Sequence, residues 1–581
     1  LRARGVVRMG RFGWEMAHPK LQSADAPKQA VAIYPSIGKM PQATIRQYVS
    51  RALEMFDGAE TVAKDLRDFD GGDWTTKDAL TFIHQPPPNL AHLAGDREHP
   101  AWRRLRFDEL LAHQIVLRRR YHRRIRQTAE AITTPPFAEK LYAHLPFSPT
   151  AAQHRAVGEV CADMAKTTPM RRLLQGDVGS GKTLVAAVAC LACALQKRTA
   201  AFMAPTSILA RQHYETLSEW FAPANVKCEL FSAEVRGKNR REAESRLRFG
   251  LSNIAIGTHA LFQENVKLPH LSLAVADEQH RFGVEQRLAL AEKGGGVHQL
   301  MMSATPIPRT LAMGVFADLD ISVLDEKPPG RATVSTTLIP ASRRTEVLAR
   351  IAARKEQGGR AFWICPRISE SPGESASEKE YAKAEKAQLA NAESVVKEAR
   401  AHHPQLMPQV VHGKTPAAEK SKVLEDFRRG KSALLVATTV VEVGVDVPDA
   451  DVMVVENAER MGLSQLHQLR GRVGRGGKSG YCILLYDGNL SAAAKERLKI
   501  LRDSDDGFAI ARRDLQLRGP GEWLGLRQSG MPMLKAAKLI EAEDIRKAAR
   551  FAADAMLSNH LRAAVSHTRR WLGKTAKLAR S

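Results

Sequence analysis

The segment Arg171-Arg-Leu-Leu-Gln175-Gly176-Asp-Val-Gly179-Ser-Gly181-Lys182-Thr183 runs from an apolar stretch of strand length into a glycine-rich turn. The apolar run that follows, residues 184–195, has the length of a helix. Residues 176–183 fit the pattern G-x-x-x-x-G-K-[ST], in which glycines let backbone N–H groups curl around phosphate oxygens at a helix N-terminus. The order strand, loop, helix therefore predicts a nucleotide phosphate site in an α/β domain.

The last two residues of this loop have specific expected roles. Lys182 is expected to bridge the β- and γ-phosphates of ATP, and the Thr183 hydroxyl is expected to bind Mg²⁺. The residues expected to surround the nucleotide are Gly176, Asp177, Val178, Gly179, Ser180, Gly181, Lys182 and Thr183.

Two acidic residues, Asp277 and Glu278, follow a second apolar run at residues 271–276. Carboxylate oxygens are preferred ligands of Mg²⁺, so Asp277 is expected to hold the ion, directly or through water. Glu278 is expected to polarise the water that attacks the γ-phosphate. An acidic strand end without chemistry is the alternative, and the order of the two motifs within one domain argues against it.

Positive charge for the transition state of hydrolysis is expected from residues 468–476, which contain Arg472 and Arg475 three positions apart. If two domains face each other across ATP, these side chains reach the γ-phosphate only when the cleft is closed, which would couple hydrolysis to domain motion. The alternative is a basic loop that contacts a nucleic-acid backbone, and it applies most to Arg470.

Short apolar runs alternate with helical stretches in two successive series, which is typical of parallel sheets buried on both faces. Two α/β domains in tandem are therefore predicted, with residues 328–330 (Pro-Pro-Gly) at their junction. Residues 369–400 are polar and predict an exposed helical insertion. The predicted strands are 171–175, 199–204, 253–257, 271–276 and 299–303, then 361–365, 409–411, 433–437, 451–456 and 481–486.

The charge balance favours a polyanionic partner. The chain has 581 residues, 87 Lys and Arg against 63 Asp and Glu, and a formal net charge of +24, so nucleic acid is expected before a membrane. The longest apolar run, residues 184–195, is too short to cross a bilayer. Six cysteines form no disulfide framework and indicate a reducing cytoplasm. Cys190 and Cys193 are interpreted as a buried helix face, because zinc needs four ligands.

An arginine-rich helix is predicted over residues 102–126, which hold nine arginines beside Asp108 and Glu109. One interpretation is a solvated helix that covers a neighbouring domain, and the other is a basic face that contacts phosphates. The apolar stripe expected to pack it is Leu105, Leu110, Leu111, Ile115 and Leu117.

Taken together, these motifs resemble those of superfamily 2 helicases with two RecA-like domains. The finer resemblance is to the RecG family of bacterial ATP-dependent DNA helicases, and it covers almost the whole chain. It rests on residues 456–468 (ENAERMGLSQLHQ) and on residues 514–522 (DLQLRGPGE), which continue to Gly530. The second segment is similar to the translocation motif that this family shares with the transcription–repair coupling translocase.

The resemblance implies further site residues. Phe147 and Gln153 would recognise adenine, since a Gln side chain offers a donor and an acceptor to the base edge. Gly444 and Asp446 would contact the nucleotide from the second domain. Those implied in DNA binding and coupling are Pro205, Thr206, Thr258, His259, Ser303, Thr305, Thr438, Arg518 and Arg527.

The resemblance also implies an α/β fold with two tandem RecA-like motor domains. The expected division is 1–25, the remnant of a wedge domain of oligonucleotide-binding type; 26–144, a helical linker; 145–328 and 329–490, the motor domains; and 491–581, the translocation motif with a basic tail. The sequence starts at Leu1 with only the last part of the wedge, so an N-terminally incomplete chain is expected.

The implied function is remodelling of branched DNA, stalled replication forks and Holliday junctions, by an ATP- and Mg²⁺-dependent enzyme that moves on double-stranded DNA. A monomer in the cytoplasm at the nucleoid is expected, with single-strand-binding protein as a candidate partner. Three alternatives stay open: a transcription–repair coupling translocase, a non-catalytic junction-binding protein and an RNA helicase.

Overall fold

The computed structural model forms two compact units, residues 1–119 with 534–581 (unit 1) and residues 120–533 (unit 2). It describes residues 2–4, 7–10, 13–16, 19–22, 32–35, 38, 40–133, 137–232, 235, 237–262, 266–278, 296–304, 319–326, 328, 333–366, 378–413, 415–438, 447, 449–474, 479–488, 490–518, 534–537 and 542–573. In the described part, no helix is both long enough and apolar enough to span a membrane.

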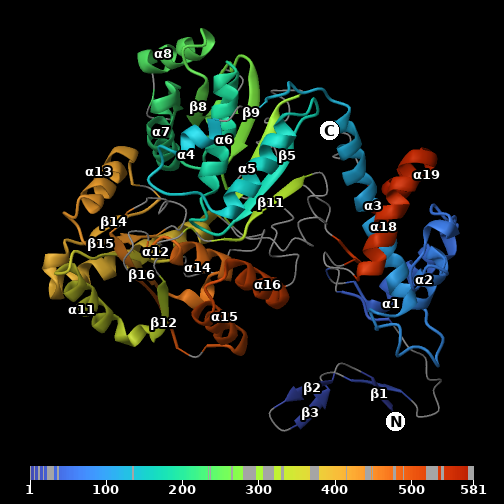
Figure 1. Cartoon of the computed structure of the whole chain (residues 1–581). Helices are drawn as coiled ribbons and strands as arrows, with labels where there is room; N and C mark the ends of the chain where they lie inside the picture. Colours follow the sequence, from blue (N-terminus) through green and yellow to red (C-terminus); the bar gives the residue numbers. More distant parts are fainter. Residues whose placement is uncertain are drawn as a thin grey trace. The chain divides into compact units, whose positions relative to one another are not determined.

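The first sheet of unit 2 has seven strands, all paired in parallel in the order β11-β5-β10-β9-β6-β8-β7. Figure 1 labels β5, β8, β9 and β11 of this sheet. Its strands are β5 (Arg171–Gly176), β6 (Thr199–Met203), β7 (Cys228–Phe231), β8 (Ile254–Gly257), β9 (Leu271–Ala276), β10 (His298–Ser303) and β11 (Asp320–Leu324). The five strands predicted for this domain are confirmed, and β7 and β11 were not predicted.

Helices cover both faces of this sheet because side chains alternate along each strand. Phe202 faces α5 (Ala151–Met164), α6 (Lys182–Leu195) and α7 (Ser207–Phe221), whereas Met203 faces α8 (Gly237–Arg248). Helix α6 is buried along almost its whole length, as its apolar run requires. Cys190 and Cys193 lie on it, and burial raises the pKa of both thiols, which confirms the interpretation as a buried helix face.

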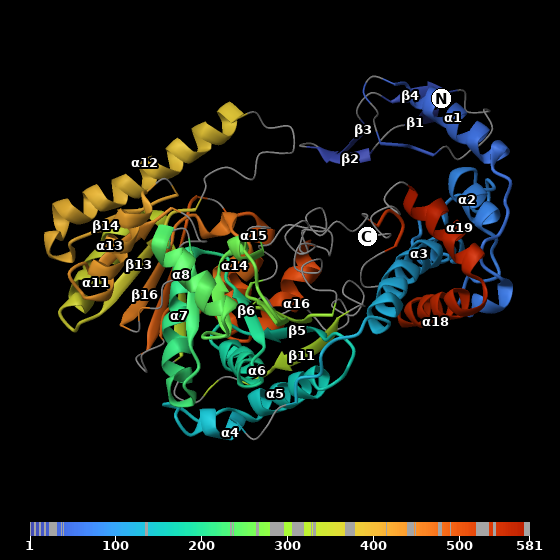
Figure 2. The same ribbon diagram turned by 90° about the horizontal axis from the view of Figure 1, so that it is seen from above.

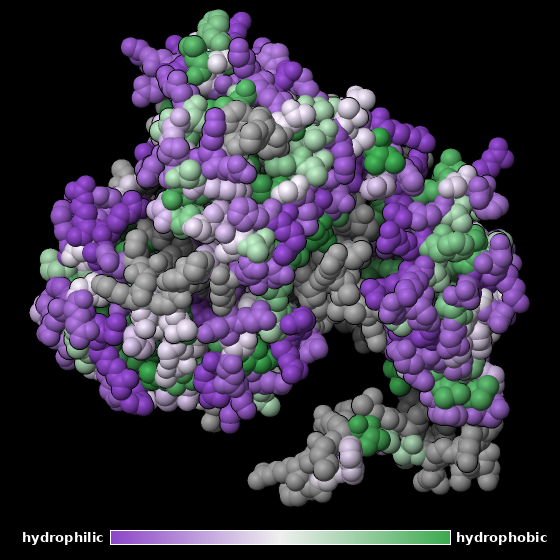
Figure 3. All heavy atoms as spheres, in the orientation of Figure 1, coloured by the Kyte–Doolittle hydropathy of each residue, from purple (hydrophilic) through white to green (hydrophobic). Residues whose placement is uncertain are grey.

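The second sheet of unit 2 has six parallel strands in the order β12-β17-β16-β13-β15-β14. They are β12 (Val334–Pro340), β13 (Arg360–Ile364), β14 (Gln409–Val411), β15 (Leu434–Ala437), β16 (Ala450–Val455) and β17 (Gly480–Tyr486). All five strands predicted here are confirmed. One face packs against α11 (Arg344–Lys355) and α12 (Glu378–His402). The other packs against α13 (Ala417–Arg428), α14 (Leu463–Arg470), α15 (Ala492–Asp503) and α16 (Gly507–Arg518). Hydrophilic side chains cover the visible surface over α11 and α13 (Figure 3).

Helix α12 corrects the prediction of an exposed insertion at residues 369–400. The helical part is confirmed, but Ala392, Val395 and Ala399 are buried against the second sheet. Figure 2 shows the last turns of α12 against the sheet and its first turns projecting away from it. The alanines that suggested an exposed helix are the small residues that let this helix lie close to the strands.

Unit 1 is built mainly from helices of both chain ends. They are α1 (Gln42–Met55), α2 (Thr76–His84), the first part of α3 (Pro100–Ile125), α18 (Glu543–Asn559) and α19 (Leu561–Leu572). Its first residues form two antiparallel strand pairs, β1 (Arg2–Arg4) with β4 (Lys20–Gln22) and β2 (Val7–Gly10) with β3 (Gly13–Met16). The compact units thus divide residues 491–581 between them, and the domain boundaries given above stay predictions. The short helix α4 (Phe137–Tyr142) belongs to unit 2.

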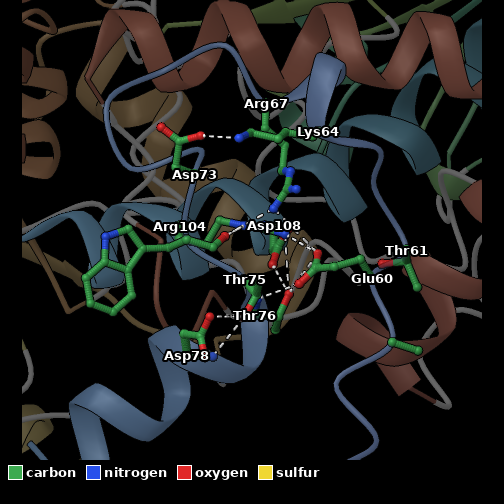
Figure 4. Close-up of polar contacts among 12 residues, drawn as sticks. Glu60, Thr61, Lys64, Arg67, Asp73, Thr75, Thr76, Asp78, Arg104 and Asp108 are labelled. Carbon is green, nitrogen blue, oxygen red and sulfur yellow. Dashed lines mark hydrogen bonds and ion pairs between the residues drawn. The ribbon is translucent and has the colours of Figure 1, made fainter.

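The arginine-rich helix is confirmed as α3, but both interpretations of its charge are wrong for its first turns. Arg104 is completely buried and pairs with Asp108 and Glu60, around which Figure 4 also shows Thr76. Arg103 pairs with Asp544, so a charge from α18 completes the cluster. These arginines are neither solvated nor available to phosphates, because buried charge is tolerated only when it is paired. The predicted apolar stripe is confirmed, since all five of its residues are buried.

Candidate nucleotide-binding site

The phosphate loop and the acidic pair lie at one edge of the first sheet. Strands β5, β10 and β9 are neighbours, with Gln175 opposite Ser303 and Ala276 opposite Met301. Because parallel strands end at the same edge, the loop after β5 and Asp277 after β9 come together there. The sheet therefore assembles the two sequence motifs that were expected to act together.

Glycine is required within the loop itself. Gly179 and Gly181 have φ angles of 76° and 81°, a left-handed conformation that residues with a side chain rarely adopt. Gly181 precedes the first turn of α6, and a Cβ atom there would lie 2.1 Å from Gln153 Nε2. The backbone N–H groups of residues 179–183 are thus held in a curled loop at a helix N-terminus, an arrangement that can bind phosphate.

Lys182 is buried and its ammonium group is held by the loop backbone. Its Nζ donates to the carbonyl oxygens of Gly176 at 2.9 Å and of Asp177 at 3.0 Å. Burial lowers the pKa of Lys182, and the nearby charges of Glu278 and Asp277 offset part of that effect. The side chain is therefore beside both acids, where a phosphate group would meet it.

Asp277 is held by a histidine that the sequence did not point to. His213 Nε2, on α7, lies 3.0 Å from Asp277 Oδ2. Burial alone would raise the pKa of Asp277, but the His213 contact and the charge of Lys182 outweigh it, so the pKa lies below its ordinary value and the carboxylate is ionised. Glu278 has a φ angle of 53°, a conformation that is strained for this residue and that concentrates at functional sites.

Gln153 is tied to the phosphate loop. Its Nε2 donates to the Ser180 carbonyl at 2.9 Å, and its Oε1 accepts from the Thr150 N–H at 2.9 Å in a capping box that starts α5. Phe147 is partly exposed, with its ring 6.1 Å from that of Trp220. Both side chains lie in the part of the chain that leads to the loop, and their role toward adenine stays a prediction.

The second sheet contributes a close contact to the same loop. Gly471 follows α14, and a Cβ atom there would lie 2.7 Å from the Cβ atom of Val178. Arg472 is next in the chain, and its charge adds to the effect of burial in lowering the pKa of Lys182. The structure therefore brings Arg472 to the nucleotide site. Arg475 lies outside the described residues.

The residues expected to bind or respond to DNA follow strands of both sheets. Thr206 caps α7 by accepting from the Leu209 N–H at 3.3 Å, and Thr258 follows β8. Pro205 follows β6, Ser303 ends β10, and Thr438 follows β15, where its carbonyl accepts from Gln388. His259 begins a short helical turn and Arg518 ends α16. Thr305, Gly444, Asp446 and Arg527 lie outside the described residues.

Comparison with known proteins adds to this geometry. Residues 150–313 match the DEAD/DEAH box helicase family, and residues 344–477 match the helicase conserved C-terminal domain. The chain is 45% identical to the ATP-dependent DNA helicase RecG of Escherichia coli K12 over 93% of its own length and 78% of that protein. This chain belongs to the RecG family. The Haemophilus influenzae RecG is 40% identical over 98% of this chain and 82% of that protein.

The structure of RecG bound to a three-way DNA junction has the same fold as this RecG-family chain. The match has a TM-score of 0.71 at 34% sequence identity and covers 95% of this chain and 70% of that one. The family, the fold class with two parallel-sheet motor domains, and the class of ATP-dependent helicase are thereby confirmed as predicted. The roles of the individual site residues stay predictions.

Proposed function

We propose that this RecG-family chain hydrolyses ATP to move on double-stranded DNA and to remodel branched DNA such as forks and Holliday junctions. The observation that carries the proposal is the meeting of the phosphate loop, Asp277 and Arg472 in unit 2 of a chain whose relatives are RecG helicases. The relative solved on a three-way junction supports branched DNA as the substrate.

The site fits a bound Mg²⁺ ion. The Thr183 hydroxyl and the ionised Asp277 carboxylate are oxygen donors, and Mg²⁺ is commonly held by one or two protein oxygens together with nucleotide phosphates. When bound, the ion would neutralise charge that develops on the phosphates. His213 would keep the Asp277 carboxylate in place for it.

The remaining steps fall to side chains of this chain. Lys182 would exchange its two carbonyl partners for phosphate oxygens, since an ammonium group bonds better to an anion than to a neutral carbonyl. Glu278 would orient the attacking water. Arg472 would stabilise the transition state from the second sheet, so hydrolysis would be fastest when both halves of unit 2 close on the nucleotide.

The test measures ATP hydrolysis with a three-way junction, a linear duplex, RNA or no nucleic acid. We expect the greatest stimulation with the junction, and we expect Lys182→Ala to lower turnover by about 100-fold or more. Absence of stimulation by any DNA would contradict the proposal. Turnover unchanged by Lys182→Ala would favour a non-catalytic junction protein, and stimulation mainly by RNA would favour an RNA helicase.

We also infer that one chain is the working unit, because the phosphate loop and Arg472 meet within unit 2 of a single chain. Light scattering on DNA-bound protein should give the mass of one chain per junction. A location at the nucleoid and binding of single-strand-binding protein are part of the proposal. Cell fractionation and co-purification would test them.

A further inference from the structure

A row of hydrogen bonds joins the phosphate loop to the end of α15. Asp177 Oδ1 lies 2.5 Å from His467 Nε2 of α14, and the other ring nitrogen, Nδ1, lies 2.8 Å from an Arg470 guanidinium nitrogen. Arg470 in turn donates to the carbonyl oxygens of Leu501 and Ser504, both at 2.8 Å. The His467 and Arg470 side chains are almost completely buried, so water does not compete for these bonds.

The direction of each bond in this row is fixed by chemistry. Arginine has donors and no acceptor, so His467 Nδ1 must accept from Arg470. His467 is therefore a neutral ring with its proton on Nε2, and it donates that proton to Asp177 Oδ1. The same oxygen accepts from the Val178 N–H at 2.7 Å. The Asp177 carboxylate is thus bonded both to α14 and to the loop backbone, and it links their positions.

The start of α16 closes over this contact. A Cβ atom at Gly507, the first residue of α16, would lie 2.7 Å from His467 Nε2 and 3.0 Å from Asp177 Cγ. Only a residue without a side chain fits there. The helix that starts at Gly507 ends at Arg518, so its last five residues, 514–518, are the first five of the segment similar to the translocation motif.

Asp177, the residue of this row that belongs to the phosphate loop, also lies next to Lys182, the residue expected to bind the nucleotide phosphates. Lys182 Nζ donates to the Asp177 carbonyl, and under the proposed function this bond is released when the ammonium group turns to phosphate. A change in the Asp177 backbone moves its carboxylate, and the His467 ring has only one orientation that keeps both of its partners. Binding of a nucleotide to the phosphate loop would therefore change the contacts that reach α15 and the start of α16.

We propose that His467 is a positioning residue that transmits the nucleotide state of the phosphate loop, through Asp177 and Arg470, to the helices that lead into the translocation motif. The proposal rests on the proposed function, because it presumes an ATP-driven motor. It predicts that loss of the contact uncouples hydrolysis from movement, with hydrolysis itself retained.

Three substitutions each disturb a defined contact of this row of hydrogen bonds. His467→Gln keeps a donor near the Nε2 position and loses the acceptor for Arg470. His467→Asn keeps an acceptor near Nδ1 and loses the reach to Asp177. Gly507→Ala leaves both partners intact and places a methyl group against their contact. His402→Ala, at the exposed end of α12, is the matched control.

The measurements are ATP turnover with junction DNA and displacement of a triplex strand from duplex DNA, expressed as strands displaced per ATP hydrolysed. We expect this ratio to fall by about tenfold in all three variants and to stay at the wild-type value in His402→Ala. Amide hydrogen exchange of α15 and α16 should respond to a non-hydrolysable ATP analogue in the wild type and not in the His467 variants. That second readout needs only folded protein.

The possible outcomes separate the two proposals. A wild-type chain without DNA-stimulated turnover would remove the proposed function. If the wild type is active and the His467 variants displace as many strands per ATP as the wild type does, the proposal for His467 is overturned. An unchanged response of α15 and α16 to the analogue in those variants would overturn it as well.

Discussion

At the scale of single residues, Gly471 allows the segment after α14 to approach the phosphate loop closely. Its backbone lies so close to Val178 that an added Cβ atom would sit 2.7 Å from the valine Cβ and 2.8 Å from its Cγ1. Rotation about χ1 of Val178 does not move its Cβ atom, so a change of rotamer cannot remove this clash. We therefore expect Gly471→Ala to displace Arg472 from the nucleotide and to lower ATP turnover by about 100-fold, measured at saturating ATP and junction DNA.

Gly158 provides the matched control for that substitution. It lies in α5 with open space around its Cα atom. Gly158→Ala should leave turnover unchanged and raise the free energy of unfolding slightly, by about 0.5–1 kcal/mol, because alanine favours a helix. If Gly471→Ala behaves like Gly158→Ala, the close approach of the two motifs does not determine the rate.

Glu109 is a second residue whose position can be tested. Its carboxylate accepts from the backbone N–H groups of Lys535, Ala536 and Ala537 at 2.7, 2.7 and 2.8 Å, and it is buried. Glu109→Ala leaves three donors without an acceptor, at a cost of at least about 3 kcal/mol. We expect faster amide exchange in α18 and α19 and unchanged exchange in the second sheet.

The control for Glu109 is an exposed carboxylate of unit 1. Glu543 pairs with Lys547 one helical turn away in α18, and both side chains are mostly exposed. Exposed pairs contribute little, so Glu543→Gln should leave the exchange rates of α18 and α19 close to those of the wild type. Equal exchange in the two variants would mean that Glu109 does not hold the segment at residues 535–537.

At the scale of elements, the central strands and one edge strand, β14, could be predicted, and the other three edge strands of the two large sheets could not. Strands buried on both faces appear as continuous apolar runs, such as 199–203 and 434–437, and these were identified. The three that were missed, β7, β11 and β12, all lie at sheet edges. Strand β12 carries three consecutive polar residues in Val334-Ser-Thr-Thr-Leu338, and this pattern does not distinguish a strand from a loop.

The same distinction applies to the candidate site. Lys182, Thr183, Asp277 and Arg472 belong to local patterns with fixed spacing, so the sequence identified them. His213 and His467 act through partners 64 and 290 positions away. No local pattern includes His213, and the segment 456–468 that includes His467 supports the family resemblance without giving that residue a partner. Two partners of the α3 arginines were missed for the same reason, since Glu60 and Asp544 are distant in sequence from the arginines that they neutralise.

The buried cluster of unit 1 should make its stability depend on pH. His567 lies between the Thr61 hydroxyl and the Asp108 carbonyl, and burial lowers its pKa below the ordinary 6.5, which Asp108 offsets in part. The unfolded chain therefore takes up a proton below about pH 6.5 that the folded chain refuses, so stability falls as the pH falls through that value. Burial lowers the pKa of His84 and His113 as well, which adds to the same trend.

The expected result is faster amide exchange of α19 at pH 5.5 than at pH 7.5, after correction for the intrinsic exchange rate. His567→Gln should reduce this difference, because glutamine offers a donor and an acceptor without a titrating group. An equal pH effect in the variant would assign the dependence to His84 and His113.

At the scale of the whole molecule, not every basic side chain that contributes to the net charge of +24 is available to DNA. Three arginines of α3 form ion pairs with acidic residues of unit 1: Arg103, Arg104 and Arg106. Charge that can meet DNA must therefore come from exposed side chains. Arg562 and Arg569 on α19 are exposed examples, and α19 carries no acidic residue. Arg562 and Arg569 are therefore candidates for contacts with DNA phosphates.

This distribution leads to a prediction for DNA binding. Each phosphate that a cation neutralises releases a bound counterion, so the logarithm of the affinity should fall linearly with the logarithm of the salt concentration. If six phosphates are neutralised, affinity for a junction should fall by about three orders of magnitude between 50 and 200 mM salt.

Replacing both Arg562 and Arg569 by alanine should reduce the magnitude of the slope of log affinity against log salt concentration by about two, if each arginine neutralises one phosphate. Arg343→Ala is the control, because that exposed side chain is already paired with Glu346, and it should leave the slope unchanged. A double variant with the wild-type slope would place the DNA elsewhere, on the loops of the two motor sheets, where Thr206 and Thr438 lie.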